Sequence, residues 1–380
     1  MNNKLEECCG CTACQQICPM QCITMKSDEE GFLYPKIDES ICIQCNKCEN
    51  ICPIHHPDVS KGKTESYVGY AINESIRRFS SSGGIFSLVA EYVLKQKGVV
   101  FGAAFDEAFM VHHICVDSKE ELYKLRGSKY VQSRLESTYT DAKKCLKNGK
   151  LVLFSGTACQ IAGLKKYLEK EYDNLLTIDV LCHGVPSPKI WKLYLEDQEK
   201  KYDSNVSSIR FRDKKLGWKR YFVSIQFENG QEYSVSFSND KFMNMFLSNI
   251  DLRPSCYDCR FKTFPRVSDI TIGDSWGIEK YMPEMDDDKG TSVIVVHTDK
   301  GRKVLKEIQK TMIFKKAELD KALPLSADSR TSVLKHPNRE KYWAELQAGK
   351  SLDEIYKCVK KNIGQKIFGY IRMKIKMWKG

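Results

Sequence analysis

Ten of the 17 cysteines in this 380-residue chain lie within its first 52 residues, and eight of them form two runs of identical spacing. The first run is Cys8-x2-Cys11-x2-Cys14-x3-Cys18-Pro19. The pattern recurs 34 residues later at Cys42, Cys45, Cys48, Cys52 and Pro53. Three thiolates on one tight loop can bind three irons of a [4Fe–4S] cubane, whereas a fourth that follows a helical turn reaches a second cluster. The duplication therefore predicts two [4Fe–4S] clusters.

The same geometry assigns each of the eight cysteines to a cluster. We expect one cluster on Cys8, Cys11, Cys14 and Cys52, and the other on Cys18, Cys42, Cys45 and Cys48. Two zinc sites made of CxxC pairs are the alternative, but zinc does not require this doubled pattern. Cys9 and Cys22 have no place in the repeat, and we expect both to be small buried side chains rather than ligands.

The composition favours a cytoplasmic protein. No apolar run approaches the roughly 20 residues of a membrane-spanning helix, and the N-terminus has no hydrophobic signal region. A reducing compartment favours metal-bound over disulfide-bonded cysteines. Residues 1–58 carry a formal charge of −5 and the remainder +16. A four-thiolate cluster adds roughly −2 when oxidised, and no basic patch with interleaved aromatic residues is present, so we expect no nucleic-acid partner.

Beyond residue 65, strand-like and helix-like segments alternate. Buried strands are predicted at residues 66–72, 98–105, 150–156 and 175–181, and helices at 87–96 and 158–172. Residues 206–237 alternate apolar and polar side chains around an Asn-Gly turn, which predicts an antiparallel meander. The expected fold is mixed α/β (α+β). A small two-cluster ferredoxin-like domain at residues 1–58, with a short strand or hairpin at 31–38, is followed by a larger mixed-sheet domain at 65–335.

Two kinds of motif in the larger domain suggest chemistry. Residues 80–84 (SSSGG) open a predicted helix, where free backbone N–H groups and the helix dipole suit a phosphate. A serine N-cap beside a flexible loop is the alternative. Four further thiols stand at strand ends or in loops: Cys159, Cys182, Cys256 and Cys259. They equal the number that a third [4Fe–4S] cluster needs, whereas unligated burial is the alternative, as we expect for Cys115, Cys145 and Cys358. His183 is expected to be a hydrogen-bonded polar residue.

Five stretches in order resemble one family. RFSSSGGIFS, LRGSKYVQS, LFSGTACQIAGLKKYL, DVLCHGVPSP and RVSDITIGDSWG together resemble the beta subunits of coenzyme F-420 (deazaflavin) hydrogenases and dehydrogenases. The resemblance covers the chain to about residue 335 and implies an iron–sulfur flavoprotein. The GVPSP and GDSWG motifs resemble those of a bacterial branch of the family that is often associated with surface-polysaccharide synthesis.

The resemblance also implies site residues. It makes Ser81, Ser82, Gly83, Gly84 and Lys129 candidates for binding FAD, and Cys159, Cys182, Cys256 and Cys259 candidates for holding a third cluster. Ala158 stands where the family usually has proline. Asp274 and Trp276 are expected to line the same cavity, without an assigned role.

The C-terminal segment is strongly basic. From residue 355 onward there are eight Lys and Arg and no Asp or Glu, while isoleucine recurs every four residues from Ile363 to Ile375. We expect a basic helical tail, residues 336–380, that docks on the body or on a partner. Peripheral contact of this basic amphipathic pattern with an anionic membrane surface is the alternative.

These features predict a FAD- and [4Fe–4S]-dependent oxidoreductase, in the cytoplasm or peripheral at the inner face of the membrane. A redox donor such as ferredoxin would supply electrons, and the flavin would exchange hydride with an organic substrate or cofactor. A non-catalytic electron-transfer subunit that docks to a separate enzyme is the alternative. A glycan-binding module with structural clusters is a third hypothesis.

Overall fold

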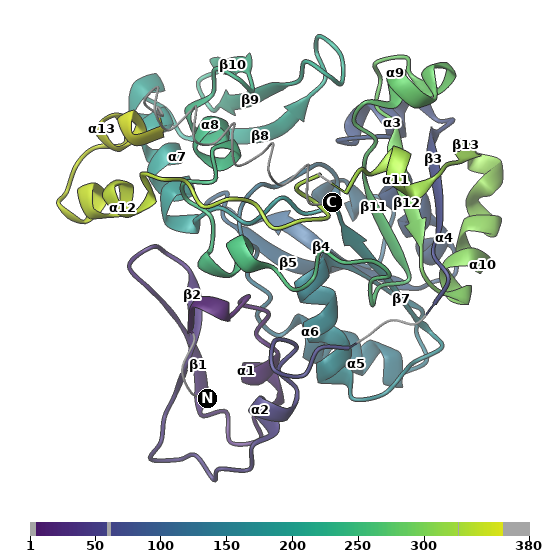
Figure 1. Ribbon diagram of the computed structural model, residues 1–380, viewed down its shortest axis with the longest axis horizontal. Coiled ribbons are helices and arrows are strands. Elements are labelled where there is room, and N and C mark those ends of the chain that lie inside the picture. The colour runs from purple at the N-terminus through teal and green to yellow at the C-terminus, as the bar shows by residue number, and fades with distance from the viewer. Residues whose placement is uncertain (1–4, 59–61, 326, 360–380) are drawn as a thin grey trace.

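The computed structural model describes residues 5–58, 62–325 and 327–359 (Figure 1). An eight-stranded sheet forms its centre, in the order β13-β3-β12-β11-β7-β6-β4-β5. Its strands are β3 (Glu65–Ala71), β4 (Val99–Phe105), β5 (Val111–Val116), β6 (Val152–Thr157), β7 (Leu175–Val180), β11 (Ile270–Asp274), β12 (Ser292–Val296) and β13 (Met312–Lys316). Strands β4, β6, β7 and β11 run parallel, and the outer strands pair antiparallel. The predicted mixed α/β class is confirmed.

Helices cover both faces of this sheet because its central strands are apolar on both sides. Along β6, Val152 and Phe154 pack into one core and Leu153 into the opposite one, as the two-residue period of a strand requires. Helices α5 (Thr138–Lys147) and α6 (Ala158–Leu168) lie on the first face, and α4 (Ile85–Lys95) and α10 (Asp299–Ile308) on the second. Smaller helices are α3 (Glu74–Phe79), α9 (Ile278–Tyr281) and α11 (Leu319–Ala322).

The four predicted buried strands correspond to β3, β4, β6 and β7, and the helix predicted at 87–96 corresponds to α4. The helix predicted at 158–172 is α6, but it ends at Leu168, so the prediction is wrong for its last four residues. Glu169 has a φ of 61°, in the left-handed region, and this conformation stops the right-handed helix.

The predicted meander is confirmed as a separate sheet of β8 (Val206–Asp213), β9 (Phe222–Phe227) and β10 (Glu232–Ser236). It shares a core with α7 (Pro188–Tyr202), α8 (Lys241–Leu247), α12 (Arg339–Gln347) and α13 (Leu352–Tyr356). The first part of the segment predicted as a tail therefore packs into the larger domain. The amphipathic pattern at 360–380 lies outside the described residues, and none of the helices within the described ranges is long and apolar enough to cross a membrane.

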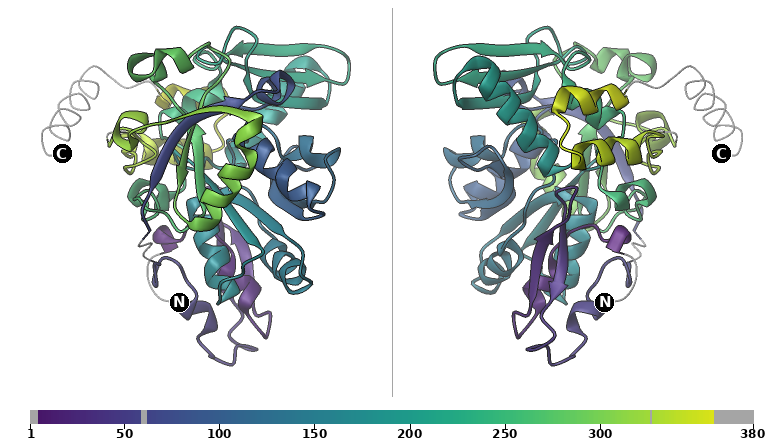
Figure 2. Two further views of the ribbon diagram at one scale, coloured as in Figure 1. Left: turned by 90° about the vertical axis from the view of Figure 1, so that its right-hand side faces the viewer. Right: turned by 90° about the vertical axis from the view of Figure 1, so that its left-hand side faces the viewer.

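The N-terminal module packs on α5 and α6, the helices that cover the first face of the sheet. It consists of α1 (Ala13–Ile17), the predicted hairpin of β1 (Ile23–Ser27) and β2 (Leu33–Ile37), and α2 (Lys47–Asn50). Figure 2 shows it at one end of the molecule, beneath α5 and α6. The side-chain oxygen of Gln16 accepts hydrogen bonds from the amides of Tyr139 (3.0 Å) and Thr140 (3.1 Å), which satisfies free N–H groups of the first turn of α5.

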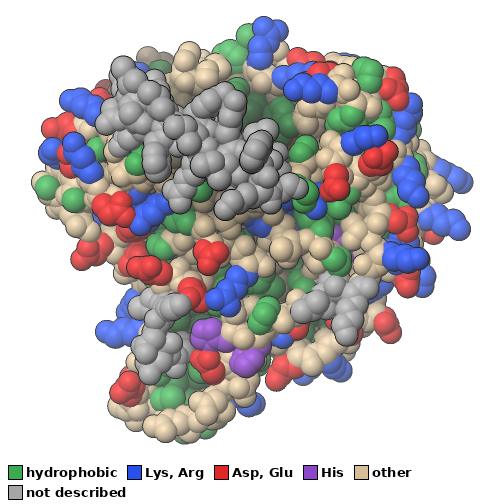
Figure 3. All heavy atoms as spheres, in the orientation of Figure 1, with side chains coloured by type: hydrophobic (Ala, Val, Ile, Leu, Met, Phe, Trp, Pro, Cys, Tyr) green, Lys and Arg blue, Asp and Glu red, His purple; other side chains and the backbone are tan. Residues whose placement is uncertain are grey.

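Basic and acidic side chains are interspersed on the face drawn in Figure 3. The excess positive charge of the larger domain is therefore not gathered into one continuous patch on that face.

Because the module packs on α6, a glycine-to-alanine substitution in this helix should destabilise the protein rather than stabilise it. Gly163 lies within α6, where alanine ordinarily stabilises a helix by roughly 0.5–1 kcal/mol. A Cβ at this position would lie 2.7 Å from the Cβ and 2.9 Å from the Sγ of Cys11. We therefore expect Gly163→Ala to lower the free energy of unfolding by about 1–3 kcal/mol, measured by urea denaturation.

Lys165→Ala on the same helix is the control. It removes an ion pair with the exposed Glu171 (3.5 Å), which is worth less than about 1 kcal/mol. Stabilisation by Gly163→Ala would contradict the close packing of the module on α6.

Candidate functional site: thiol sets around two cavities

The sequence duplication of the module extends to its backbone. Thr12 and Asn46, which are 34 residues apart, both precede a short helix and both have a φ of 58°. Gly10 and Gln44 repeat the relation with φ values of 70° and 53°. These left-handed residues curl each loop so that its cysteines can face one centre.

The thiols approach one another as the crossed assignment expects. Burial, together with the neighbouring sulfurs of Cys8 and Cys52, raises the pKa of Cys14 to about 12. Burial raises the pKa of Cys48, and the sulfur of Cys18 adds to this effect. Each fourth cysteine thus lies beside the other run. The ligand assignment itself stays a prediction.

The two sets differ in exposure. Cys11 is buried against α6, and Cys52 is packed in the same core, so we call Cys8, Cys11, Cys14 and Cys52 the inner set. Cys18, Cys42, Cys45 and Cys48 are the outer set, and Cys45 is exposed. Ile43 beside it is 60% exposed. The outer set is therefore the one that a partner molecule can approach.

Cys22 is buried as predicted, with its sulfur 3.4 Å from that of Cys18. It thus lies directly beside the outer set. Cys9 is buried as well, but its surroundings differ from those of Cys22 because it faces the larger domain.

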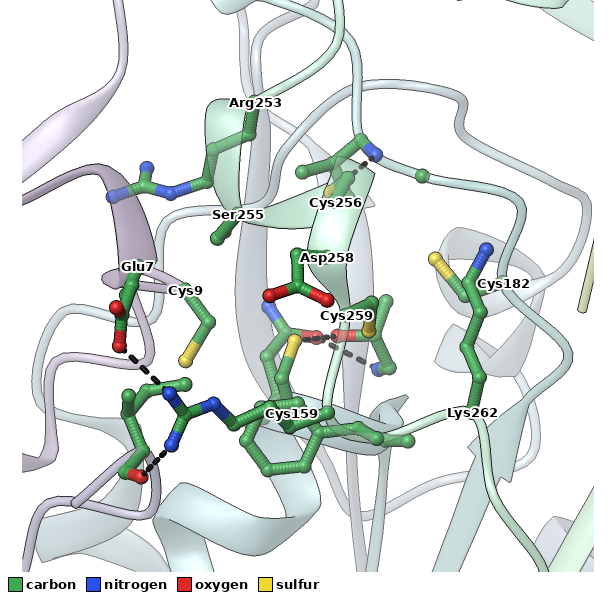
Figure 4. A pocket seen from close by; sticks show the side chains of 18 of the residues that line it. Glu7, Cys9, Cys159, Cys182, Arg253, Ser255, Cys256, Asp258, Cys259 and Lys262 are labelled. Carbon is green, nitrogen blue, oxygen red and sulfur yellow. Dashed lines mark hydrogen bonds and ion pairs between the residues drawn. The ribbon is translucent and has the colours of Figure 1, made fainter. Parts of the chain in front are cut away.

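The four further thiols of the larger domain surround one cavity. We call Cys159, Cys182, Cys256 and Cys259 the body set; with Cys9 they line a cavity of about 50 Å³, the thiol cavity (Figure 4). In the described ranges, no three Cys, His, Asp or Glu side chains form a site for a single metal ion. The body thiols instead lie around a cavity wall, and four separate thiolates are the ligand set of a [4Fe–4S] cluster.

Sheet topology explains how distant thiols meet. Strands β6 and β7 are parallel neighbours, so their carboxyl ends lie at the same edge of the sheet. Cys159 follows β6 within the first turn of α6, and Cys182 follows β7. Cys256 lies in the short helix Pro254–Asp258, and Cys259 follows that helix directly.

Cations stand beside these thiols. Burial raises the pKa of Cys259, and the nearby Lys262 and Arg266 partly oppose this effect. Lys262 is itself buried, and its Nζ donates to the carbonyl oxygens of His183 (2.8 Å) and Thr331 (3.1 Å). Fixed positive charge favours thiolates, which is the form that binds iron.

A second and larger cavity, of about 590 Å³, adjoins the first. Thr157, Gln160 and Cys182 contribute to the walls of both cavities. Residues that the sequence singled out also line the larger cavity, among them Ser81, Ser82, Gly84, Lys129, Asp274 and Trp276.

The serine–glycine loop is held in place by hydrogen bonds. The Ser81 hydroxyl accepts from the amide of Ser128 at 2.6 Å. Gly83 is buried below the cavity, and its amide donates to the hydroxyl of Ser292 at 2.9 Å. The expectation of a free N–H is therefore wrong for Gly83. A Cβ there would lie 2.5 Å from the carbonyl oxygen of Gly69, so glycine is required for close packing.

Lys129 lies on the cavity wall with few polar partners. Its Nζ donates to the carbonyl oxygen of Arg126 at 3.1 Å and lies 5.6 Å from the ring centre of Phe105. Burial lowers the pKa of Lys129 to about 7. An anion bound in the cavity would restore the charged form.

Asp274 and Trp276 belong to a rigid group at the cavity wall. Asp274 accepts hydrogen bonds from Arg212 (2.8 Å) and from the indole N–H of Trp218 (2.8 Å). Trp276 stacks on Trp218, with ring centres 4.5 Å apart and planes 3° apart. Trp276 is 47% exposed. Asp274 thus fixes the Arg212 guanidinium, whose central carbon also lies over the ring of Trp276 at 4.9 Å from its centre.

Two histidines also line the larger cavity. His183 contacts Asn249 (2.6 Å) and Asp328 (3.3 Å), which agrees with the expected hydrogen-bonded polar role. Sequence reasoning missed His113, whose ring nitrogens contact Ser133 and Ser155. Burial lowers the pKa of His113 to about 4, so the ring is neutral at pH 7.

Comparisons with known proteins match three stretches of the chain. Residues 66–139 match the family model of the N-terminal part of the coenzyme F420 hydrogenase/dehydrogenase beta subunit, and residues 149–322 match that of its C-terminal part. Residues 7–55 match the family model of a 4Fe-4S dicluster domain. A chain of the F420-reducing [NiFe] hydrogenase complex from Methanosarcina barkeri is similar, with 17% identity over 77% of this chain and 91% of that chain and a TM-score of 0.47. No curated protein matches. The predicted iron–sulfur module and family resemblance are confirmed.

The crossed assignment predicts which cluster a fourth cysteine supports. Cys18→Ala should remove the outer cluster and spare the inner one, because Cys18 lies beside Cys48. Iron content and EPR spectra of anaerobically reconstituted protein measure this. The lost EPR signal should be the one that Cys42→Ala removes, not the one that Cys14→Ala removes.

Cys22→Ala is the matched control, since Cys22 contacts Cys18 but lies outside the repeat. It should retain all iron. Selective loss of the inner signal in Cys18→Ala would reverse the assignment.

Proposed function

Because the chain belongs to the coenzyme F420 hydrogenase/dehydrogenase beta-subunit family, we propose that it is an iron–sulfur flavoprotein oxidoreductase. It would pass electrons between [4Fe–4S] clusters and a FAD that exchanges hydride with an organic substrate or cofactor. The supporting observation is the common wall of the two cavities, where Cys182 faces both the body thiols and the larger cavity.

The body set fits a third cluster by its chemistry. It offers four thiols in a small cavity whose walls also carry the cations Lys262, Arg253 and Arg266 and the carboxylates Glu7 and Asp258. These cations would balance the net negative charge of a four-thiolate cluster. Cys159, Cys182, Cys256 and Cys259 are the proposed ligands.

The larger cavity fits a flavin nucleotide by its size and polar groups. Its volume lies within the roughly 300–1,000 Å³ of ligand pockets, and the start of α4 opens into it beside Ser81 and Ser82. Helix starts favour phosphates. A flavin supplies the exchange between one-electron carriers and two-electron hydride chemistry.

This chain's own residues would bind and orient that nucleotide. Ser81, Ser82, Gly84 and Lys129 would hold its phosphates, whereas Gly83 only supports the loop from below. Arg212, fixed by Asp274, places a cation on the wall of the same cavity. The neutral His113 would contribute an uncharged ring beside it.

Electrons would enter at the outer set, where Cys45 is exposed. A ferredoxin-type donor is the proposed source, and the beta-subunit character of the family favours a partner enzyme subunit. The link to surface-polysaccharide synthesis and the membrane contact of the basic tail stay predictions from the sequence alone.

The same beta-subunit character favours a second candidate, a non-catalytic electron-transfer subunit that serves a separate enzyme. The two functions differ in one measurable respect. An isolated chain that reduces a substrate with dithionite as donor would be an enzyme by itself, whereas turnover only after addition of a partner would favour the second function.

Cofactor content tests the main proposal. Iron, sulfide and flavin should be quantified on one anaerobically reconstituted sample. We expect about 12 irons per chain, equal sulfide and one FAD, because three [4Fe–4S] clusters contain four irons each. A chain that binds no flavin would overturn the proposal. A content of about eight irons per chain would exclude the third cluster.

Lys129 predicts a pH dependence of FAD binding. The pKa of Lys129 in the protein without FAD is about 7, and a bound phosphate would raise it. Above pH 7, Lys129 therefore takes up one proton when FAD binds. Affinity should be flat below pH 7 and should fall by up to about tenfold per pH unit above it. Fluorescence titration with FAD between pH 6 and 9 measures this.

Two variants isolate the lysine. Lys129→Arg keeps a permanent charge and should abolish the slope. Lys129→Met should abolish the slope and weaken binding at pH 6. An unchanged slope in Lys129→Met would assign the proton to another group.

A further inference from the structure

Two polar side chains stand where the larger cavity meets the thiol cavity. Gln160, in the first turn of α6, lines both cavities. Ser133 lines the larger cavity, whereas the preceding residue, Gln132, lines the thiol cavity. We call Gln160 and Ser133 the wall pair. Neither side chain has a role in the binding of phosphates proposed above.

The side-chain amide of Gln160 has a defined orientation. Its Oε1 accepts a hydrogen bond from the amide of Thr157 at 2.9 Å, within the capping box of α6, so the other end of the side chain is its NH2 group. Gln160 is 7% exposed. Among the residues that the structure describes, none accepts a hydrogen bond from this Nε2. A buried amide therefore presents an unused donor at the boundary of the two cavities.

Gly156 allows this arrangement and relates Gln160 to His113. A Cβ at Gly156 would lie 2.9 Å from the Oε1 of Gln160 and 3.5 Å from the Nε2 of His113. A side chain at this position would therefore push the glutamine away from the start of α6. Because Gln160 and His113 both flank Gly156, which itself lines the larger cavity, they belong to one stretch of its wall.

His113 determines where the hydroxyl proton of Ser133 points. The pKa of His113 is lowered to about 4 by burial, so at pH 7 only one ring nitrogen carries a proton. Its Nε2 lies 3.0 Å from the carbonyl oxygen of Ser155, which can only accept, so the proton is on Nε2. Nδ1 therefore accepts from the Ser133 hydroxyl at 2.6 Å, whereas the carbonyl oxygen of Arg134 is 3.4 Å from that hydroxyl. The oxygen of Ser133 remains an acceptor in the cavity wall.

A donor and an acceptor on one wall select a ligand edge with the complementary groups. The pyrimidine edge of an isoalloxazine ring has one N–H donor, N3–H, between two carbonyl acceptors. An adenine edge also combines a donor with an acceptor. Only the isoalloxazine, however, exchanges electrons with one-electron carriers, and it gains from a position beside the thiols. The location of the wall pair therefore favours the flavin ring over the adenine.

We propose that Gln160 and Ser133 bind the pyrimidine edge of the FAD ring and hold it at the wall shared with the thiol cavity. The Nε2 of Gln160 donates to a ring carbonyl oxygen, and the Oγ of Ser133 accepts from N3–H. This inference rests on the proposed FAD site and adds to it the residues that orient the reactive ring.

The test is a calorimetric titration of the anaerobically reconstituted full chain with FAD and with ADP, which lacks the ring. Gln160→Glu keeps an acceptor for the Thr157 amide but loses the amide donor, and Gln160→Met has no donor at any pH. Ser133→Ala removes the acceptor. Each variant should weaken FAD binding about tenfold and leave ADP binding unchanged.

A flavin analogue tests the contact with Ser133 from the side of the ligand. Methylation of N3 removes the N3–H, so the wild type should bind N3-methyl-FAD about tenfold more weakly than FAD. Ser133→Ala should bind the two flavins equally, because the same hydrogen bond is already lost. Ser137→Ala is the matched control, since the Ser137 hydroxyl donates to Asp141 (2.7 Å) and lines neither cavity. It should retain the wild-type affinities.

Three results would overturn the inference. Wild-type FAD affinity in both Gln160 variants would remove the amide contact, and an equal loss of FAD and ADP affinity would assign the wall pair to the adenine. The same ratio of FAD to N3-methyl-FAD affinity in the wild type and in Ser133→Ala would remove the N3–H contact. A wild type that binds no FAD would instead be a failure of the proposed function, which is recognised before any variant is compared.

Discussion

The buried guanidinium of Arg253 joins the N-terminal module to the larger domain. It donates to the carbonyl oxygens of Cys8 (2.7 Å) and Leu33 (3.0 Å) and to the side-chain oxygen of Gln132 (2.9 Å). All three acceptors are neutral, and a buried cation is stable only when its donors are satisfied. Its hydrogen bonds connect two segments of the module with the loop that leads to Cys256. The relative position of the inner and body thiols depends on this contact.

The parallel part of the sheet supplies the second constraint. Strands β6, β7 and β11 run in the same direction, so the residues that follow them gather at one edge, where α/β proteins commonly bind ligands. Cys159, Cys182 and Asp274 reach that edge from three different strands. The thiol cavity and the larger cavity are therefore neighbours, and the spatial order runs from the outer set through the inner set and the body set to the larger cavity.

Much of this arrangement could be predicted from local sequence. The cluster motif is a spacing rule over 11 residues, and the left-handed residues at positions 12 and 46 follow the same repeat. Apolar strands such as residues 150–156 and the alternating meander could also be predicted, because successive side chains of a strand point to opposite faces. The end of α6 could not be predicted, since it depends on the left-handed conformation of the single residue Glu169. Nothing in the local sequence around Gly83 indicated that its amide donates a hydrogen bond to Ser292.

The sequence by itself determined the two cluster motifs, the mixed α/β class and the family, because each depends on spacing, periodicity or several motifs in fixed order. Only the tertiary structure decided which thiols share a cavity. Cys159 and Cys256 are separated by nearly a hundred residues, and Cys9 lies in another domain, so no local pattern relates them. The parallel pairing of β6 with β7 and the docking through Arg253 bring these sulfurs to one wall. For that reason Cys9, which the sequence indicated as a small buried side chain, lies on the wall of the thiol cavity.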